Sequence, residues 1–284
     1  MKKILVPTDF SENAFLAARY AAEMAKKHHY SLHIIHFYTA VSSGFDENEL
    51  GEGREQPDIL KADLTIKEWV GRLQTQYPDI PISYHNDRGL LEEALPKEAK
   101  REDYVAIAMG TTGASANKNI FWGSNTALIV AKSPIPVIAI PNIEHITTEI
   151  KKAGLLTNFK QEELTTLQEF VHIFKQEIDV ALIHVYKESE NVTSVNNRLD
   201  SWSFNVHEFS AVRQTSRLIA PTLKEDKDQD TIPEVISKLI DVQDVDIILV
   251  SKTRKTFFER LFTSSVSKAV TLKLQKPAFF GKTI

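Results

Sequence analysis

The sequence predicts an α/β fold made of two tandem, doubly wound parallel-sheet domains. Three observations lead to this prediction: the length of 284 residues, a long internal repeat, and short apolar runs that alternate with helical patterns. A domain averages roughly 150 residues, so the length suffices for two. Hydrophobic residues make up 42% and charged residues 25% of the chain, which excludes disordered and fibrous classes.

The repeat is visible as three matched segments. Residues 2–10 recur at 151–159, residues 32–38 at 180–186, and residues 103–109 at 244–250. In the first pair, KKILVPTDF against KKAGLLTNF, two lysines, a threonine and a phenylalanine recur at an offset of 149. Because the order of the matches is preserved, we expect two domains, residues 1–145 and residues 146–284.

Strand and helix signals alternate in the first half. Ile4–Val6, closed by Pro7, predicts a buried strand, and Ser11 can cap the alanine-rich helix that follows. The remaining elements are expected at strand 32–38, helix 59–77, strand 80–85, helix 90–101, strand 104–109, helix 125–132 and strand 136–140. Strands joined by helices imply right-handed crossovers and therefore a parallel, doubly wound sheet.

The second half repeats this order with one degraded element. Its second helix is expected to be short, near Val195–Ser201, and its last strand is expected at 276–280. The two halves are expected to pair as an intramolecular pseudo-dimer through their last strands. A homodimer of the whole chain is left open.

Composition excludes several classes of function. The net charge is −4, with 34 basic against 38 acidic residues, so the sequence predicts no nucleic-acid partner. There is no cysteine, which excludes disulfides, thiolate zinc sites and cysteine nucleophiles. The apolar run at the N-terminus is too short for a signal peptide, and no window reaches the roughly 18 apolar residues of a membrane span. We therefore expect no membrane association and a cytoplasmic location.

The candidate ligand site follows from where parallel strands end. Ligands bind at the carboxyl ends of such strands, beside helix N-termini. The first strand ends in Pro7-Thr8-Asp9, and the fourth runs into a glycine pattern, G-x2-G-x9-G-S, formed by Gly110, Gly113, Gly123 and Ser124. Such glycines can turn the chain tightly and expose backbone N–H groups, although the same spacing also fits a plain loop. Neither G-x-G-x-x-G nor the P-loop motif occurs, which argues against dinucleotide enzymes and P-loop ATPases.

Taken together, these segments resemble a known family. Residues 3–11 (KILVPTDFS), the glycine segments and the closing PVIAI at 136–140 resemble the universal stress protein family, and the duplicated chain resembles its tandem type. The resemblance covers residues 1–141 strongly and 151–284 weakly. It implies a Rossmann-like fold of the adenine nucleotide alpha hydrolase kind that binds ATP, or the related AMP or ADP, with Mg²⁺ as a possible companion.

The resemblance also implies a set of binding residues. Pro7, Thr8 and Asp9 would flank the ribose and adenine, and Phe37 would line the base pocket. The residues implied around the phosphates and the nearby sugar are Met109, Gly110, Gly113, Gly123, Ser124 and Asn125. The N–H groups of a helix N-terminus can hold phosphate oxygens, and the Asp9 carboxylate can accept from ribose hydroxyls or hold Mg²⁺.

The second half departs from this pattern. Asn158 replaces the counterpart of Asp9, and the three glycine positions are taken by Ser251, Arg254 and Ser264. An arginine cannot replace a glycine whose φ is positive, and its side chain would cross the phosphate space. The basic cluster Lys252, Arg254, Lys255 and Arg260 is either a solvated loop or a site for an anion or acidic partner. We expect a nucleotide-free partner domain.

Two groups of residues are assigned structural roles instead. His28, His29, His33 and His36 resemble a metal cluster in sequence, but strand alternation puts His33 and His36 on opposite faces. Trp69 and Trp202 are assigned to packing or an interface, and so is Trp122, with cover for the ligand as its alternative role.

The leading hypothesis is a stress-response regulatory protein. Its first half would bind ATP or a related adenine nucleotide, and its second half would supply an interface for an unidentified protein partner. One alternative is a weak ATPase or autophosphorylating enzyme, with turnover far below that of kinases because the motif offers Asp9 but no Lys or Arg. The other is a ligand-free scaffold or chaperone-like protein.

Overall fold

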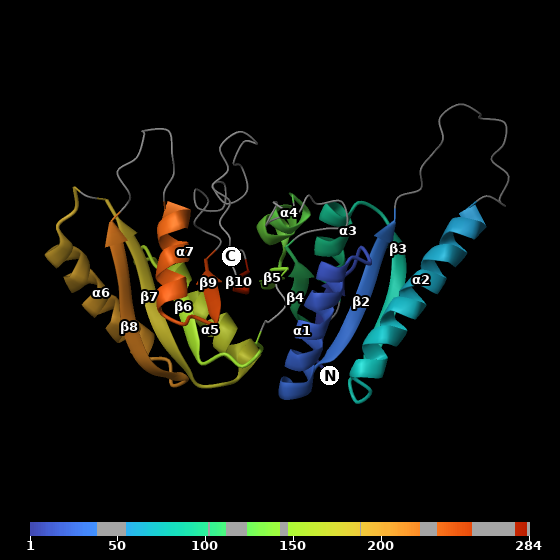
Figure 1. Cartoon of the computed structure of the whole chain (residues 1–284), viewed down its shortest axis with the longest axis horizontal. Helices are drawn as coiled ribbons and strands as arrows, with labels where there is room; N and C mark the ends of the chain where they lie inside the picture. The colour runs from blue at the N-terminus through green and yellow to red at the C-terminus, as the bar shows by residue number, and fades with distance from the viewer. Residues whose placement is uncertain are drawn as a thin grey trace, which may run out of the picture.

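The computed structural model describes residues 1–38, 55–101, 103–111, 124–142, 147–187, 189–221, 232–251 and 276–282. In these residues, ten strands form one sheet in the order β3-β2-β1-β4-β5-β10-β9-β6-β7-β8. Figure 1 shows the two halves of the chain side by side, with the sheet running through both. The fold is therefore α/β with a mostly parallel sheet, as predicted.

The first half contains the elements that the sequence predicts. They are β1 (Lys3–Pro7), α1 (Glu12–His28), β2 (Ser31–Tyr38), α2 (Glu55–Gln76), β3 (Ile82–Arg88), α3 (Leu91–Glu98), β4 (Tyr104–Gly110), α4 (Ser124–Lys132) and β5 (Val137–Ile140). Ser11 caps α1 as expected, because its Oγ accepts from the Ala14 N–H at 3.2 Å.

The second half repeats the order of the first. Its elements are β6 (Lys152–Leu156), α5 (Gln161–Phe174), β7 (Ile178–Tyr186), α6 (Val192–His207), β8 (Val212–Pro221), α7 (Ile232–Val242), β9 (Ile247–Val250) and β10 (Ala278–Phe280). The prediction of a short helix near Val195–Ser201 is wrong, since α6 has 16 residues. Its N-cap is Asn191, and the buried positions Val195, Leu199, Trp202 and Val206 continue at helical spacing past Ser201.

Helices cover both faces of the sheet. One buried layer joins α1, α2, α5 and α6 to side chains such as Ile4, Leu32 and Leu182. The other layer joins α3, α4 and α7 to the alternate side chains, such as Leu5, Ile35 and Ile107. Successive strand residues point to opposite faces, so the strands of both halves read as continuous apolar runs.

The halves meet through their last strands. β10 pairs with β5 in antiparallel register, with Phe279 opposite Ile138, whereas every other neighbouring pair is parallel. The fully buried Phe279 ring packs edge-on against Phe170 of α5 at 5.4 Å between centroids. The last strands of the two halves thus pair with each other, as the sequence predicts.

Helices α1 and α5 add a second set of contacts between the halves. The Tyr30 hydroxyl donates to the Ile173 carbonyl at 2.8 Å, and Lys27 Nζ donates to Gln176 Oε1 at 2.6 Å. His28 packs edge-on against Phe174, with 6.1 Å between ring centroids. The end of α1 is therefore fixed to the second half by both polar and apolar contacts.

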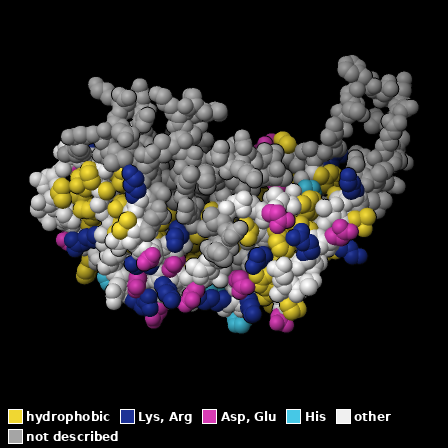
Figure 2. All heavy atoms as spheres, viewed as in Figure 1, with side chains coloured by type: hydrophobic (Ala, Val, Ile, Leu, Met, Phe, Trp, Pro, Cys, Tyr) yellow, Lys and Arg dark blue, Asp and Glu magenta, His cyan; other side chains and the backbone are white. Residues whose placement is uncertain are grey.

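The surface shows no sorting of charge in the view of Figure 2, where basic and acidic side chains are intermixed below the grey segments. In the described part of the chain, no helix combines the length and the apolar character needed to cross a membrane.

His28 gives the junction a pH dependence. Burial, together with Lys27, Lys175 and His29, lowers the pKa of His28 to about 4. The unfolded chain, with a histidine pKa near 6.5, therefore binds more protons than the folded chain between pH 6.5 and pH 4. We expect this group to lower the free energy of unfolding by about 2 kcal/mol from pH 7 to pH 5.

Urea denaturation at both pH values measures this effect. The variant His28→Gln should lose that part of the pH dependence, whereas His207→Gln, exposed on α6, should keep it. An unchanged pH dependence in His28→Gln would contradict the assignment.

Candidate functional site

The candidate site lies where the strand order reverses. From β1 the chain passes through α1 to β2 on one side, while β4 pairs with the other side of β1. Open parallel sheets bind ligands at the carboxyl ends of strands at such a point, and we call the space expected at the carboxyl ends of β1 and β4 the crevice. The predicted residues Pro7, Thr8, Asp9 and Met109 all lie at this end of the sheet.

The turn after β1 is held by its own hydrogen bonds. Thr8 is buried, its N–H donates to the Ile35 carbonyl at 2.9 Å, and its Oγ1 accepts from the Phe10 N–H at 2.9 Å. The Thr8 carbonyl accepts from His36 Nδ1 at 2.8 Å, so that nitrogen carries the proton. The exposed Asp9 uses Oδ1 to accept from the Ser11 N–H at 3.1 Å. These bonds leave Asp9 at the rim of the crevice.

Phe10 completes the turn. Its φ of 64° is in the left-handed region, which non-glycine residues adopt at a cost. Its ring lies 4.3 Å from the His36 ring and 6.5 Å from Trp69 of α2 between centroids. Trp69 thus serves packing, in agreement with the role assigned from sequence.

Gly110 ends β4, and its surroundings explain why it is a glycine. A Cβ at this position would lie 2.5 Å from Asn13 Oδ1 and 3.0 Å from the Asn13 carbonyl oxygen. Gly110 has no positive φ, since Gly89 is the only described glycine that does. The glycine pattern predicts a tight turn at Gly110, whereas the structure shows a close approach between β4 and the start of α1.

The first turn of α4 is fixed over the end of β4. Thr126 Oγ1 donates to the Gly110 carbonyl at 2.9 Å. Ser124 opens α4, and Asn125 is exposed in its first turn. The loop from Thr112 to Gly123 lies outside the described residues, and with it Gly113, Trp122 and Gly123.

Phe37 lies on the opposite face of β2 from His36. It packs against the layer that also contains Met109 and Ile35, whereas Phe10 packs against the other layer. The structure therefore brings Phe37 and Met109 to one face at the same end of the sheet.

The second half builds the same turn. The Thr157 carbonyl accepts from His184 Nδ1 at 2.9 Å, and Thr157 Oγ1 accepts from the Phe159 N–H at 3.0 Å. Phe159 has a φ of 63°, and the centroid of its ring lies 6.2 Å from that of Trp202 of α6. The threonine, phenylalanine, histidine and tryptophan of this turn are thus a repeated structural device, found in both halves.

Besides Asn158 in place of Asp9, a residue that was not predicted from the sequence distinguishes the second turn from the first. Glu163, in the first turn of α5, is fully buried. Its Oε2 accepts from the Thr157 hydroxyl at 2.6 Å, and its Oε1 accepts from the Asn158 N–H at 2.7 Å. The residue 149 positions earlier, in α1, is Ala14. The sequence contains one pattern that could have identified Glu163: it is an acidic residue on the apolar face of α5, which also carries Leu164, Leu167 and Phe170.

Of the residues that replace the predicted binding residues in the second half, the structure describes two. Asn158 is exposed at the end of β6, and Ser251 is buried after β9. Arg254, Ser264 and the basic cluster lie outside the described residues.

The histidines do not gather into a metal site. His33 contacts Ser83 Oγ at 2.7 Å and His85 Nδ1 at 2.9 Å, on the opposite face from His36. In the described ranges, no group of three or more His, Asp or Glu side chains has a geometry for a metal ion.

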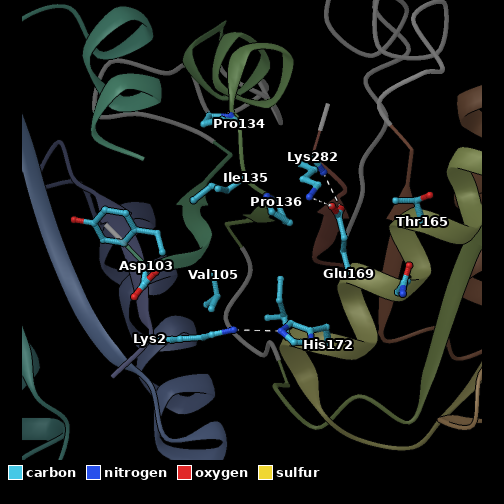
Figure 3. Close-up of a pocket in the computed structure, with 13 residues that line it drawn as sticks. Lys2, Asp103, Val105, Pro134, Ile135, Pro136, Thr165, Glu169, His172 and Lys282 are labelled. Carbon is cyan, nitrogen blue, oxygen red and sulfur yellow. Dashed lines mark hydrogen bonds and ion pairs between the residues drawn. The ribbon is translucent and has the colours of Figure 1, made fainter. Parts of the chain in front are cut away.

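A cavity of about 490 Å³ lies elsewhere, between the two halves at the amino ends of β1 and β4. Figure 3 shows Lys2 reaching His172, with 3.2 Å between Nζ and Nε2, and Lys282 paired with Glu169.

The residue 149 positions before Glu169 is the buried Tyr20, whose pKa is raised by burial and by Asp246. The cavity is separate from the crevice, which lies at the other end of the strands.

Comparisons with known proteins agree on one family. The universal stress protein family matches residues 1–141. A universal stress protein of Thermus aquaticus is 29% identical over 147 residues, 49% of this chain and 98% of its own. One of Methanocaldococcus jannaschii is 24% identical over 147 residues, 49% of this chain and 81% of its own. A solved universal stress protein of Archaeoglobus fulgidus shares the fold over 99% of this chain and 96% of its own, with a TM-score of 0.70 at 18% identity.

The close approach at Gly110 can be measured. We expect Gly110→Ala to lower the free energy of unfolding by about 1–3 kcal/mol, because Asn13 must move to admit the methyl group. Gly71→Ala, in α2 with open space around its Cβ, is the matched control and should raise stability by up to about 1 kcal/mol. Urea denaturation followed by circular dichroism compares the two. Equal stability of both variants would contradict the packing role of Gly110.

Proposed function

Because its first 141 residues place the chain in the universal stress protein family, we propose that the first half binds an adenine nucleotide, ATP or the related AMP or ADP, in the crevice between β1 and β4. The observation that carries the proposal is the anchored turn that holds Asp9 at the rim of this crevice, opposite the first turn of α4. Binding serves regulation: nucleotide occupancy would change how the chain engages a protein partner in the cytoplasm.

The phosphates are assigned to the start of α4. The unpaired N–H groups of a helix N-terminus attract anions, and the bond from Thr126 to Gly110 keeps this terminus beside the end of β4. Thr111, the next residue after β4, is buried, and its hydroxyl has no hydrogen-bond partner in the part of the chain that the structure describes. A ligand oxygen would supply one, which supports a polar ligand at this place.

The sugar, base and metal are assigned to the other wall. The Asp9 carboxylate provides an acceptor for ribose hydroxyls or an oxygen ligand for Mg²⁺, which prefers carboxylates and phosphates. Phe37 and Met109 share one face of the sheet at this end and offer apolar surface to the base. When bound, the nucleotide would supply the negative charge that α4 and the metal neutralise.

The two halves would have different roles. Residues 1–145 would hold the nucleotide, and residues 146–284 would act as the partner domain. Asn158 lacks the charge of Asp9, and Glu163 already occupies the donors of its turn, so both features support a second half without nucleotide. A ligand shifts partner binding only if its affinity differs between two states of the protein. The loop after Thr111, implied in phosphate binding, is the segment through which we expect that difference to act.

Exchanging the side chains of Asp9 and Asn158 tests the proposal. Isothermal titration of the full chain with MgATP and with AMP should give one nucleotide per chain. Asp9→Asn keeps the acceptor for Ser11 but removes the charge, and we expect it to weaken MgATP binding about tenfold, or roughly 1.4 kcal/mol. Asn158→Asp in the second half is the matched control and should leave affinity and stoichiometry unchanged.

Three results would overturn the proposal: no binding at near-millimolar nucleotide, two nucleotides per chain, or equal losses in both variants. Phosphate release measured on the same samples should stay far below about 1 s⁻¹, the low end for kinases. Faster release that Asp9→Asn abolishes would assign an enzyme instead.

A further inference from the structure

The cavity between the two halves has the size of a small-molecule site. Its volume of about 490 Å³ falls within the range of about 300–1,000 Å³ in which proteins bind small organic ligands. One wall is formed by the starts of β1 and β4 and the segment before β5, and the other wall by α5 (Figure 3). A ligand in this cavity would therefore contact both halves at once.

The first wall of the cavity is largely apolar. Val105 and Pro136 are buried there, and Pro134 and Ile135 are half-buried beside them. Ile173 adds a buried apolar side chain from the side of α5. An aromatic ring gains free energy by leaving water for such surroundings. The wall therefore offers room for a ring.

Lys2 places a positive charge at one end of the cavity. Its Nζ lies 3.2 Å from His172 Nε2, and the histidine nitrogen accepts because an ammonium group can only donate. In the described residues, no ion pair joins Lys2 to Asp103 or Glu169, the two acids that line the cavity. Glu169 is paired with Lys282 instead, and water screens the exposed Asp103. Within the described part of the chain, two of the three donors of Lys2 thus remain for an anion.

The internal repeat contains a second copy of this place, and there it holds an aromatic side chain. At an offset of 149, the counterpart of Glu169 is Tyr20 of α1. At an offset of 141, the counterpart of Val105 is Asp246, just before β9. Tyr20 is only 4% exposed, and burial and the charge of Asp246 raise its pKa, so its hydroxyl lies near the start of β9. Glu169 lies near the start of β4 in the same way, but it leaves a cavity where Tyr20 supplies a ring.

We propose that the cavity between the halves binds a small aromatic carboxylate, with its ring against Val105 and Pro136 and its carboxylate at Lys2. The ring takes the place that Tyr20 takes in the repeat, and Lys2 donates charge-assisted hydrogen bonds to the carboxylate. Such a ligand joins β1 and β4 of the first half to α5 of the second, and stabilises the folded chain by binding to it. The cavity is at the amino ends of the strands, so this proposal does not depend on nucleotide binding at their carboxyl ends.

Titration of the isotope-labelled full chain with benzoate, followed by NMR, tests the proposal. We expect a dissociation constant of about 1 mM, with shifts of the amide signals of Val105, Ile135 and Ile173. Benzamide keeps the ring without the charge, and acetate keeps the charge without the ring, so each should bind about fivefold more weakly or worse. Benzoate at several millimolar that leaves these amides unshifted, or that binds no better than benzamide or acetate, would overturn the proposal.

Two lysines at equivalent positions of the repeat show where the charge acts. Lys2→Gln removes the ammonium group, and we expect it to weaken benzoate binding about fivefold. Lys151→Gln is the matched control, because Lys151 is the counterpart of Lys2 at an offset of 149 and is exposed beside Glu149. This control should leave the affinity unchanged. An undiminished affinity in Lys2→Gln, or an equal loss in both variants, would contradict the role of Lys2.

Filling the cavity tests the position of the ring. Glu169→Tyr introduces at this position the residue found in the repeat, and Ile135→Trp enlarges the opposite wall. Each variant that circular dichroism shows to be folded should lose benzoate binding, and retained binding in a folded variant would refute the proposal.

MgATP separates this proposal from the proposed function. Saturating MgATP should not displace benzoate, and displacement would assign benzoate to the nucleotide crevice and refute the cavity as its site. A chain that binds benzoate in the cavity but binds no nucleotide would retain this inference while the proposed function fails.

Discussion

A phenylalanine held in the left-handed region closes the turn after the first strand of each half, and the shape of both turns depends on it. Left-handed φ values cost a non-glycine residue roughly 1–2 kcal/mol, so the surroundings must compensate. Here the compensation is the same in both halves: a buried threonine whose carbonyl is bound by a histidine of the next strand, and a ring that packs between that histidine and a helix tryptophan. The turn in each half sets where the following helix begins.

Both halves contain this turn, and they differ in the side chains that lie next to it. Asp9 and Ala14 leave the first turn with an exposed carboxylate at its rim and a methyl group behind it. Asn158 and Glu163 leave the second turn with a neutral rim and a carboxylate within. A duplicated chain can therefore separate binding from support through very few side chains, while the hydrogen bonds that shape both turns stay the same.

Most of the architecture was predictable because periodicity and the repeat are properties of the sequence. The elements of the first half, the cap at Ser11 and the pairing of the last strands follow from local patterns and from the order of matches. The length of α6 was not predicted, because its buried residues Leu199, Trp202 and Val206 match Ile66, Trp69 and Leu73 of α2 at an offset of 133, outside the offsets of 141 to 149 at which the other segments match. The correspondence of Trp69 with Trp202 was hidden for the same reason: their offset is 133, after the second half has lost loop length.

The candidate site was harder to predict, because a residue type serves several physical purposes. Gly110 fits a phosphate-binding pattern, yet its surroundings show a contact with Asn13 that requires a glycine with or without a ligand. Glu163 is one of two adjacent acids at the start of a helix, and only its burial separates it from Glu162. Sequence patterns identify where the backbone turns. They do not show which side chain lies next to the turn, because that depends on the packed structure.

The antiparallel contact between β5 and β10 has one more consequence. Each of these strands would be the edge of its own half-sheet, with unpaired backbone groups that invite another chain. Here they satisfy each other, and the outermost strands are β3 and β8, which carry charged residues such as Asp87, Arg213 and Arg217. Covalent linkage turns a two-chain association into an intramolecular one, so dilution cannot separate the halves.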